Sequence, residues 1–153
     1  MLTIDTFNRL TGQETLHPLV GIADLTAASL DCDIDRPCNF YALLCNGERL
    51  RLIIPGESFR IPSAHNKRKE GYTGVLFHPD ILCDTPLEND IARYCRRCNC
   101  CKKLCDNEKK TIDDCIGLIA HELDHSIDRY SGAIIVSQIE LLLNYCTRIC
   151  CQN

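Results

Sequence analysis

The residues with the clearest chemical potential are His121, Glu122 and His125, which form the pattern H-E-x-x-H. On a helix, a spacing of four places both imidazoles on one face, where they can bind Zn²⁺ while the glutamate activates a water. A third ligand is needed, and the one glutamate that follows, Glu140, lies on another predicted helix. We interpret the two histidines as solvated helix residues and keep a small zinc hydrolase as an alternative.

A second candidate is a basic segment that carries five thiols within eleven residues: Cys95, Cys98, Cys100, Cys101 and Cys105. Thiolates bind Zn²⁺ and Cu(I), and neighbouring Arg and Lys side chains lower thiol pKa values. Structural zinc sites, however, usually combine two separated C-x-x-C pairs, and this segment holds one. The segment is therefore either a surface connector or a cysteine-ligated metal or redox sensor.

The composition restricts the class of protein. The chain has 153 residues, 45% hydrophobic residues and a net charge of -4, which fits one domain with a real core and argues against a dedicated nucleic-acid binder. No transmembrane run and no signal peptide are expected. The 13 cysteines are then most simply free thiols in a reducing cytoplasm.

Two long apolar patterns must position these groups. Apolar residues recur every three or four positions over residues 107–128, which predicts an amphipathic helix, and Tyr130-Ser131-Gly132 separates it from a second one. The second helix, which begins at Ser131, is apolar over more than one face, so we expect a helical hairpin that self-associates as a homodimer. The predicted dimer stripe on it is Ile135, Ile139, Leu142, Cys146 and Ile149.

The first half of the chain reads as short antiparallel strands. Strand-like runs cover residues 40–45 and 49–54 around the turn Asn46-Gly47, and further short runs cover residues 58–61 and 72–77. Thr85-Pro86-Leu87-Glu88 is a capping box that starts a short helix over residues 86–94. Strands followed by helices predict an α+β fold in a single domain over residues 1–153, with a β-rich part to about residue 82 and a helical part from about residue 85.

Several motifs occur together in a fixed order. A strand ends in Phe77-His78-Pro79-Asp80-Ile81-Leu82, a threonine-led helix follows over residues 85–94, and the hairpin carries Cys115, the run 122–131 and the run 135–148. In this combination the chain resembles the N-terminal regulatory domain of AraC-type transcriptional regulators, particularly the form common in Bacteroides-like bacteria. The match covers the second half of the chain well and the β-rich half loosely.

The resemblance implies a small cupin-like antiparallel β-barrel that binds a small-molecule effector, followed by helices that dimerise the regulator. It implies a non-enzymatic domain without a cofactor. In full-length members the last helix continues into a linker and helix-turn-helix motifs, whereas this sequence stops at Asn153, so no direct nucleic-acid binding by this chain is expected. For the effector pocket we predict Tyr41, Arg51 and Phe59.

Overall fold

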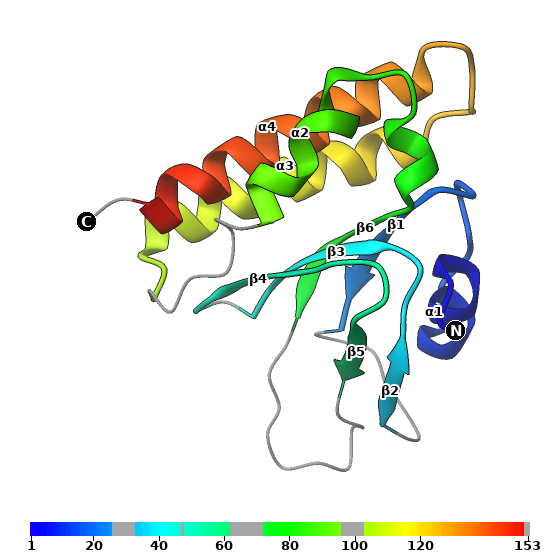
Figure 1. Cartoon of the computed structure of the whole chain (residues 1–153), viewed down its shortest axis with the longest axis horizontal. Helices are drawn as coiled ribbons and strands as arrows, with labels where there is room; N and C mark the ends of the chain where they lie inside the picture. Colours follow the sequence, from blue (N-terminus) through cyan, green and yellow to red (C-terminus); the bar gives the residue numbers. More distant parts are fainter. Residues whose placement is uncertain (26–32, 47, 62–71, 96–102, 152–153) are drawn as a thin grey trace.

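The computed structural model describes residues 1–25, 33–46, 48–61, 72–95 and 103–151. These residues build layers, with the helices of the C-terminal half above a four-stranded sheet, and the N-terminal helix and a second small sheet on its other side (Figure 1). In chain order the elements are α1 (Ile4–Thr11), β1 (Val20–Asp24), β2 (Ile34–Pro37), β3 (Tyr41–Cys45), β4 (Leu50–Ile53), β5 (Ser58–Ile61), β6 (Thr73–Phe77), the 3₁₀ helix η1 (Pro79–Leu82), α2 (Pro86–Cys95), α3 (Asp106–Leu123) and α4 (Ser131–Cys151). The fold class is α+β, as the sequence predicts.

The larger sheet is antiparallel with the strand order β1-β6-β3-β4, and the smaller one pairs β2 with β5, also antiparallel. The hairpin predicted at Asn46 joins β3 to β4, where Asn46 Oδ1 accepts hydrogen bonds from the backbone amides of Glu48 and Arg49. Over the described residues these strands form two separate sheets. They do not form a closed barrel there, so the cupin-like barrel that the resemblance implies stays a prediction.

Both faces of the four-stranded sheet are covered, which explains its nearly continuous apolar strands. Along β3, Leu43 and Cys45 point into a core shared with α2, α3 and α4. Ala42 and Leu44 point the other way, into a second core shared with α1 and the small sheet, where the rings of Phe7 and Phe59 meet edge to face. Period-two alternation along one strand thus separates two hydrophobic cores.

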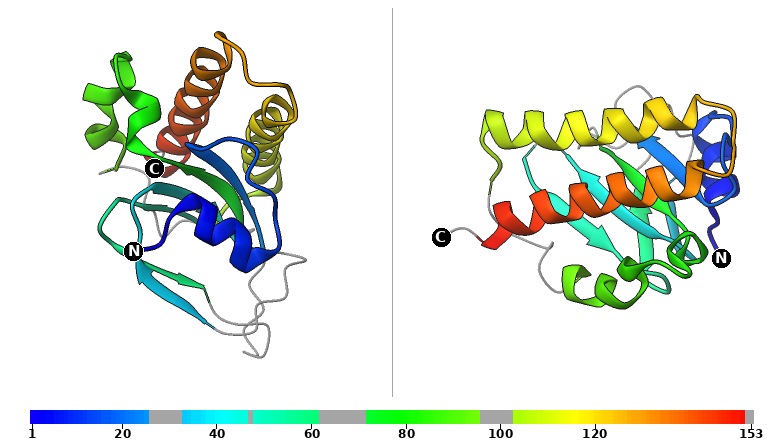
Figure 2. Two further views of the ribbon diagram at one scale, coloured as in Figure 1. Left: turned by 90° about the vertical axis from the view of Figure 1, so that its right-hand side faces the viewer. Right: turned by 90° about the horizontal axis from the view of Figure 1, so that it is seen from above.

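The helices α3 and α4 lie side by side across one face of the large sheet and are joined at one end, next to α1 (Figure 2). The first of them ends at Leu123, five residues before the predicted end at residue 128. The carboxylate of Asp128 instead accepts hydrogen bonds from the backbone amides of Tyr130 and Ser131 and so caps the start of α4. A residue that caps the next helix cannot extend the preceding one.

Neither α1 nor β2 was predicted from the sequence. The helix α1 is fixed by Thr3, whose Oγ1 accepts from the amide of Thr6, and by Gly12, whose left-handed φ of 75° ends it. The strand β2 exposes three of its four residues and ends in Pro37, as suits the edge of a sheet.

Among the described residues, α4 alone is long and apolar enough to cross a membrane, with a mean hydropathy of 1.3, and 39% of that window is buried. This is weak support for a membrane span, because core helices of soluble proteins have the same character. In this chain α4 packs against α3, α2 and η1. Its buried apolar side chains, among them Ile135, Ile139 and Leu142, thereby find partners within the fold.

Candidate functional site

The H-E-x-x-H residues do not lie on one helical face. Because α3 ends at Leu123, His121 is in its last turn and His125 lies beyond it, where its Nδ1 is 2.7 Å from the carbonyl oxygen of Ser126. Both imidazoles are exposed. In the described part of the chain no three His, Cys, Asp or Glu side chains gather as a metal site would require. The geometric premise of the zinc hydrolase, two imidazoles on one helix face, is absent.

The cysteine segment is described only at its two ends, because Cys98, Cys100 and Cys101 lie outside the described residues. Cys95 is half-buried at the end of α2, and Cys105 is exposed immediately before α3. The backbone amide of Cys105 donates to Glu108 Oε1 at 2.9 Å, which helps to start α3. Cys95 ends α2 and Cys105 precedes α3, so these two thiols belong to separate structural elements.

The predicted dimer stripe is internal. Ile135, Ile139, Leu142, Cys146 and Ile149 are all at most 5% exposed and belong to the core between the helices and the sheet. The periodicity identified a buried face correctly, but that face meets α3 and the sheet of its own chain. These five residues therefore pack within their own chain, apart from the edge of Ile149 that reaches a surface groove, so they do not form the free surface that the sequence predicts.

A different apolar surface does face solvent. Leu118 is 49% exposed on α3, and Ile134 and Leu141 are 39% and 44% exposed on α4. Ile134 and Leu141 are seven residues apart, or two helical turns, so they share one face of α4. We call Leu118, Ile134 and Leu141 the outer strip.

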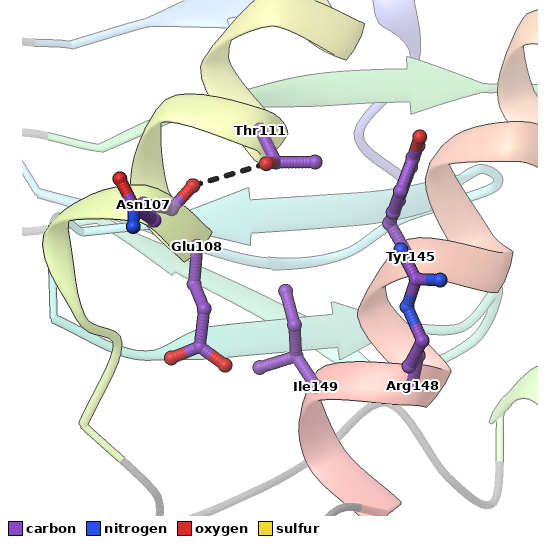
Figure 3. A pocket seen from close by; sticks show the side chains of 6 residues that line it. All are labelled: Asn107, Glu108, Thr111, Tyr145, Arg148 and Ile149. Atoms are coloured by element: carbon purple, nitrogen blue, oxygen red, sulfur yellow. Dashed lines mark hydrogen bonds between the residues drawn. The ribbon is translucent and has the colours of Figure 1, made fainter.

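A shallow groove of about 150 Å³ extends this face towards the open end of the hairpin. Figure 3 shows its lining, with Asn107, Glu108 and Thr111 from α3 opposite Tyr145, Arg148 and Ile149 from α4. Leu118 lies seven residues from Thr111, and Leu141 lies four residues from Tyr145. By helical periodicity the outer strip and the groove are thus parts of one continuous surface where α3 and α4 meet.

The predicted effector residues are not brought together. Tyr41 stacks on Phe77 at 5.1 Å in the core under the helices, whereas Phe59 is fully buried in the other core. Arg51 is exposed on β4. Since the sheet separates the two rings, Tyr41, Arg51 and Phe59 cannot line one pocket, and that prediction is wrong.

A larger cavity of about 470 Å³ lies elsewhere, where α1, β1 and the end of α3 meet. Its lining combines an apolar floor with carboxylates and amides: Asn8, Gln13, Glu14, Leu16, Val20, Gly21, Ile22, Asp24, Ala120, Leu123 and Asp124. No local sequence pattern predicts this cavity, because its residues come from three distant segments. The signals available for α1 were the amphipathic pattern of residues 4–8, with Ile4, Phe7 and Asn8 buried, and the capping residues Thr3 and Gly12.

Comparison with known proteins does not name a function for this cavity or for the outer strip, because no protein-family model and no curated protein matches the sequence.

Proposed function

We propose that this chain is the sensing and dimerisation domain of an AraC-type transcriptional regulator, without catalytic activity and located in the cytoplasm. The proposal rests on the ordered motifs in the sequence and is supported by their arrangement in an α+β unit, with the helical hairpin lying across a sheet (Figure 1). On this proposal the two facing sheets are a reduced form of the cupin-like barrel of that family.

The observation that carries the proposal is the outer strip on the hairpin. Leu118, Ile134 and Leu141 are large apolar side chains exposed on one side of two packed helices, whereas the opposite side is core. Apolar side chains gathered on a surface in this way mark a contact with another molecule. We propose that the other molecule is a second copy of this chain, in a twofold arrangement.

The charges at the two ends of α4 favour that occupant. Asp124, Asp128 and Arg129 are exposed beside its N-terminal end, and Arg148 is exposed near its C-terminal end, across the groove from Glu108. When two copies pack antiparallel, Asp124 and Asp128 of one copy can face Arg148 of the other, and Arg129 can face Glu108. The surface is thus complementary to itself in charge as well as in apolar character.

The test uses substitutions of neighbouring leucines on α4. Leu141→Asp places a charge in the outer strip and should convert a dimer into a folded monomer, because the side chain is outside the core. Leu142→Asp places the same charge at a position that is 1% exposed and should unfold the chain. Light scattering after size-exclusion chromatography gives the mass, and far-ultraviolet circular dichroism gives the helix content.

Ile127→Asp is the matched control, since Ile127 is 59% exposed but lies in the loop between the helices. This variant should remain dimeric. A monomeric wild-type chain at about 50 µM, or a dimer that persists unchanged in Leu141→Asp, would contradict dimerisation through the outer strip; the micromolar range is where modest interfaces assemble.

A further inference from the structure

A second line of side chains runs along α4 beside the one that packs into the core. The core stripe from Ile135 to Ile149 repeats with spacings of four, three, four and three residues, and the residues one position earlier repeat in the same way. This spacing presents one continuous row of side chains to a partner helix. We call the row the α4 seam: Ile134, Gln138, Leu141, Tyr145 and Arg148.

Gln138 is the polar residue between the two exposed apolar members of the seam, Ile134 and Leu141, and lies about one helical turn from each. Its side chain is half-buried, and its Oε1 atom is covered by the chain although no donor among the described residues bonds to it. A buried acceptor without a donor is costly, so such an atom calls for a partner. The missing partner belongs in the middle of the surface that carries the outer strip.

Leu118 lies level with Gln138 on the neighbouring helix. In the groove, Thr111 of α3 lies opposite Tyr145 of α4 (Figure 3). The two helices are joined at one end and run antiparallel (Figure 2), so seven residues forward along α3 and seven back along α4 bring Leu118 opposite Gln138. The middle of the surface thus holds an exposed leucine beside an unsatisfied amide oxygen.

A twofold axis at this level would match each feature of the surface with a complement. In an antiparallel pair of α4 helices, a residue before Gln138 in one copy meets a residue equally far after Gln138 in the other. Ile134, four residues before, then meets Leu141, three residues after. Asp128 and Arg148 are each ten residues from Gln138, so opposite charges meet at both ends of the contact.

Other arrangements lose one of these matches. An axis one turn later, at Leu141, would set Ile134 against Arg148. It would also leave the Gln138 amide against an apolar side chain, without water and without a partner. A parallel pair would keep the two amides together but would set Arg148 against Arg148 and Asp128 against Asp128.

We propose that the twofold axis of the dimer passes at the level of Gln138 and that this residue fixes the register of the two chains by pairing with its own copy. The inference rests on the proposed function, because it concerns the same dimer. Rotation about the last side-chain bond exchanges the oxygen and the NH₂ group of a glutamine amide, so Oε1 turns outwards as the copies meet. Each Oε1 then accepts a hydrogen bond from Nε2 of the other copy, and Leu118 of both copies shields the pair from water.

The first test exchanges charges at position 138. A residue at the twofold axis meets its own copy, so Gln138→Glu and Gln138→Lys should each repel themselves and weaken the dimer at least about tenfold. Equimolar mixing of the two variants should restore a dimer of one chain of each kind, with a Kd within about threefold of the wild type. Sedimentation equilibrium gives the Kd, and native mass spectrometry with one variant ¹⁵N-labelled identifies the mixed dimer.

Ala133→Glu and Ala133→Lys are the matched controls, because Ala133 is exposed on α4 and lies outside the seam. Both should dimerise as the wild-type chain does. Homodimers of the two variants at position 138 that are as tight as the wild type would overturn the proposed register. Equal weakening in the control pair would overturn it as well, since a charge anywhere on α4 would then have the same effect.

The second test uses the wild-type chain and does not depend on the folding of a variant. Mixed dimers of a ¹³C,¹⁵N-labelled chain and an unlabelled chain report contacts between the copies through isotope-filtered nuclear Overhauser effects. The side-chain NH₂ of Gln138 should show contacts to Gln138 or Leu118 of the other copy, and the methyl groups of Ile134 should show contacts to those of Leu141. Contacts between Ile134 of the two copies, or none from Gln138, would overturn the register.

These outcomes separate the register from the dimer itself. A dimer that Leu141→Asp dissociates, but that Gln138→Glu and Gln138→Lys leave as tight as the wild type, would keep the proposed function and overturn the register. A wild-type chain that is monomeric at about 50 µM would overturn both.

Discussion

The phenolic hydroxyl of Tyr94 donates a 2.8 Å hydrogen bond to Asn144 Oδ1 and thereby joins α2 to α4 across fifty residues of sequence. Tyr94 is 4% exposed, and its ring belongs to the core under the helices. The short helix that the capping box predicts is thus held against the hairpin by a polar contact as well as by packing. This contact makes α2 part of the helical layer.

Tyr94→Phe should remove that bond and keep the ring. We expect a loss of about 1 kcal/mol in the free energy of unfolding, and a melting temperature lower by about 2–4 °C. Tyr145→Phe is the control, because Tyr145 contacts Arg148 through its ring face and should tolerate loss of the hydroxyl. Calorimetric melting of both variants checks this; equal melting temperatures would show that water replaces the bond without cost.

Gly74 should be intolerant of any side chain. A Cβ there would lie 2.1 Å from the carbonyl oxygen of Leu43 in the neighbouring strand, so β6 and β3 would have to separate. Gly74→Ala should cost at least about 2 kcal/mol in stability. Gly117→Ala, on the exposed face of α3 with nothing within 4 Å, should stabilise by about 0.5–1 kcal/mol. Urea unfolding should show a lower free energy of unfolding for Gly74→Ala and a higher one for Gly117→Ala than for the wild-type chain. An unchanged free energy for Gly74→Ala would contradict the close contact between β6 and β3.

Acid should weaken the start of α4. The backbone hydrogen bond from Tyr130, followed by the bonds from Ser131, lowers the pKa of Asp128 from its ordinary value of 3.8. Since the folded pKa is below the unfolded one, this carboxylate stabilises the fold fully above about pH 4 and loses that contribution as the pH falls through the lowered value.

Asp128→Asn keeps an acceptor for the cap but cannot titrate. Urea unfolding between pH 6 and pH 2.5 should therefore show a shallower loss of stability in this variant than in the wild-type chain, with the difference confined to pH values below about 4. Parallel curves for the two proteins would mean that the cap of Asp128 contributes nothing that depends on its charge.

Thiol reactivity should follow burial. Burial raises the pKa of Cys38 and of Cys115, so both thiols are protonated at neutral pH as well as inaccessible. Iodoacetamide at pH 7.5 should label the exposed Cys105 and Cys151 about tenfold faster or more. Peptide mass spectrometry after timed quenching measures the rates, and labelling in urea is the control in which the four thiols converge. Fast labelling of Cys38 in the folded chain would contradict its place in the core.

The sequence by itself determined the elements whose ends are marked by local chemistry. Asn46 marked the turn between β3 and β4, Pro86 marked the start of α2, and Ser131 marked the start of α4, because turns and caps depend on residues within a few positions of one another. The order of strands before helices then gave the α+β class. Periodicity also identified which face of α4 is apolar.

Only the tertiary structure decided what each face meets. The stripe from Ile135 to Ile149 is buried by α3 and the sheet of the same chain, and Leu118, Ile134 and Leu141 are left outside, because periodicity defines a buried face but not its partner. The ring of Phe59 and that of Tyr41 fall on opposite sides of the sheet for the same reason. The cavity lined by Asn8, Gly21 and Asp124 exists only where three distant segments meet, and no local pattern encodes such a meeting.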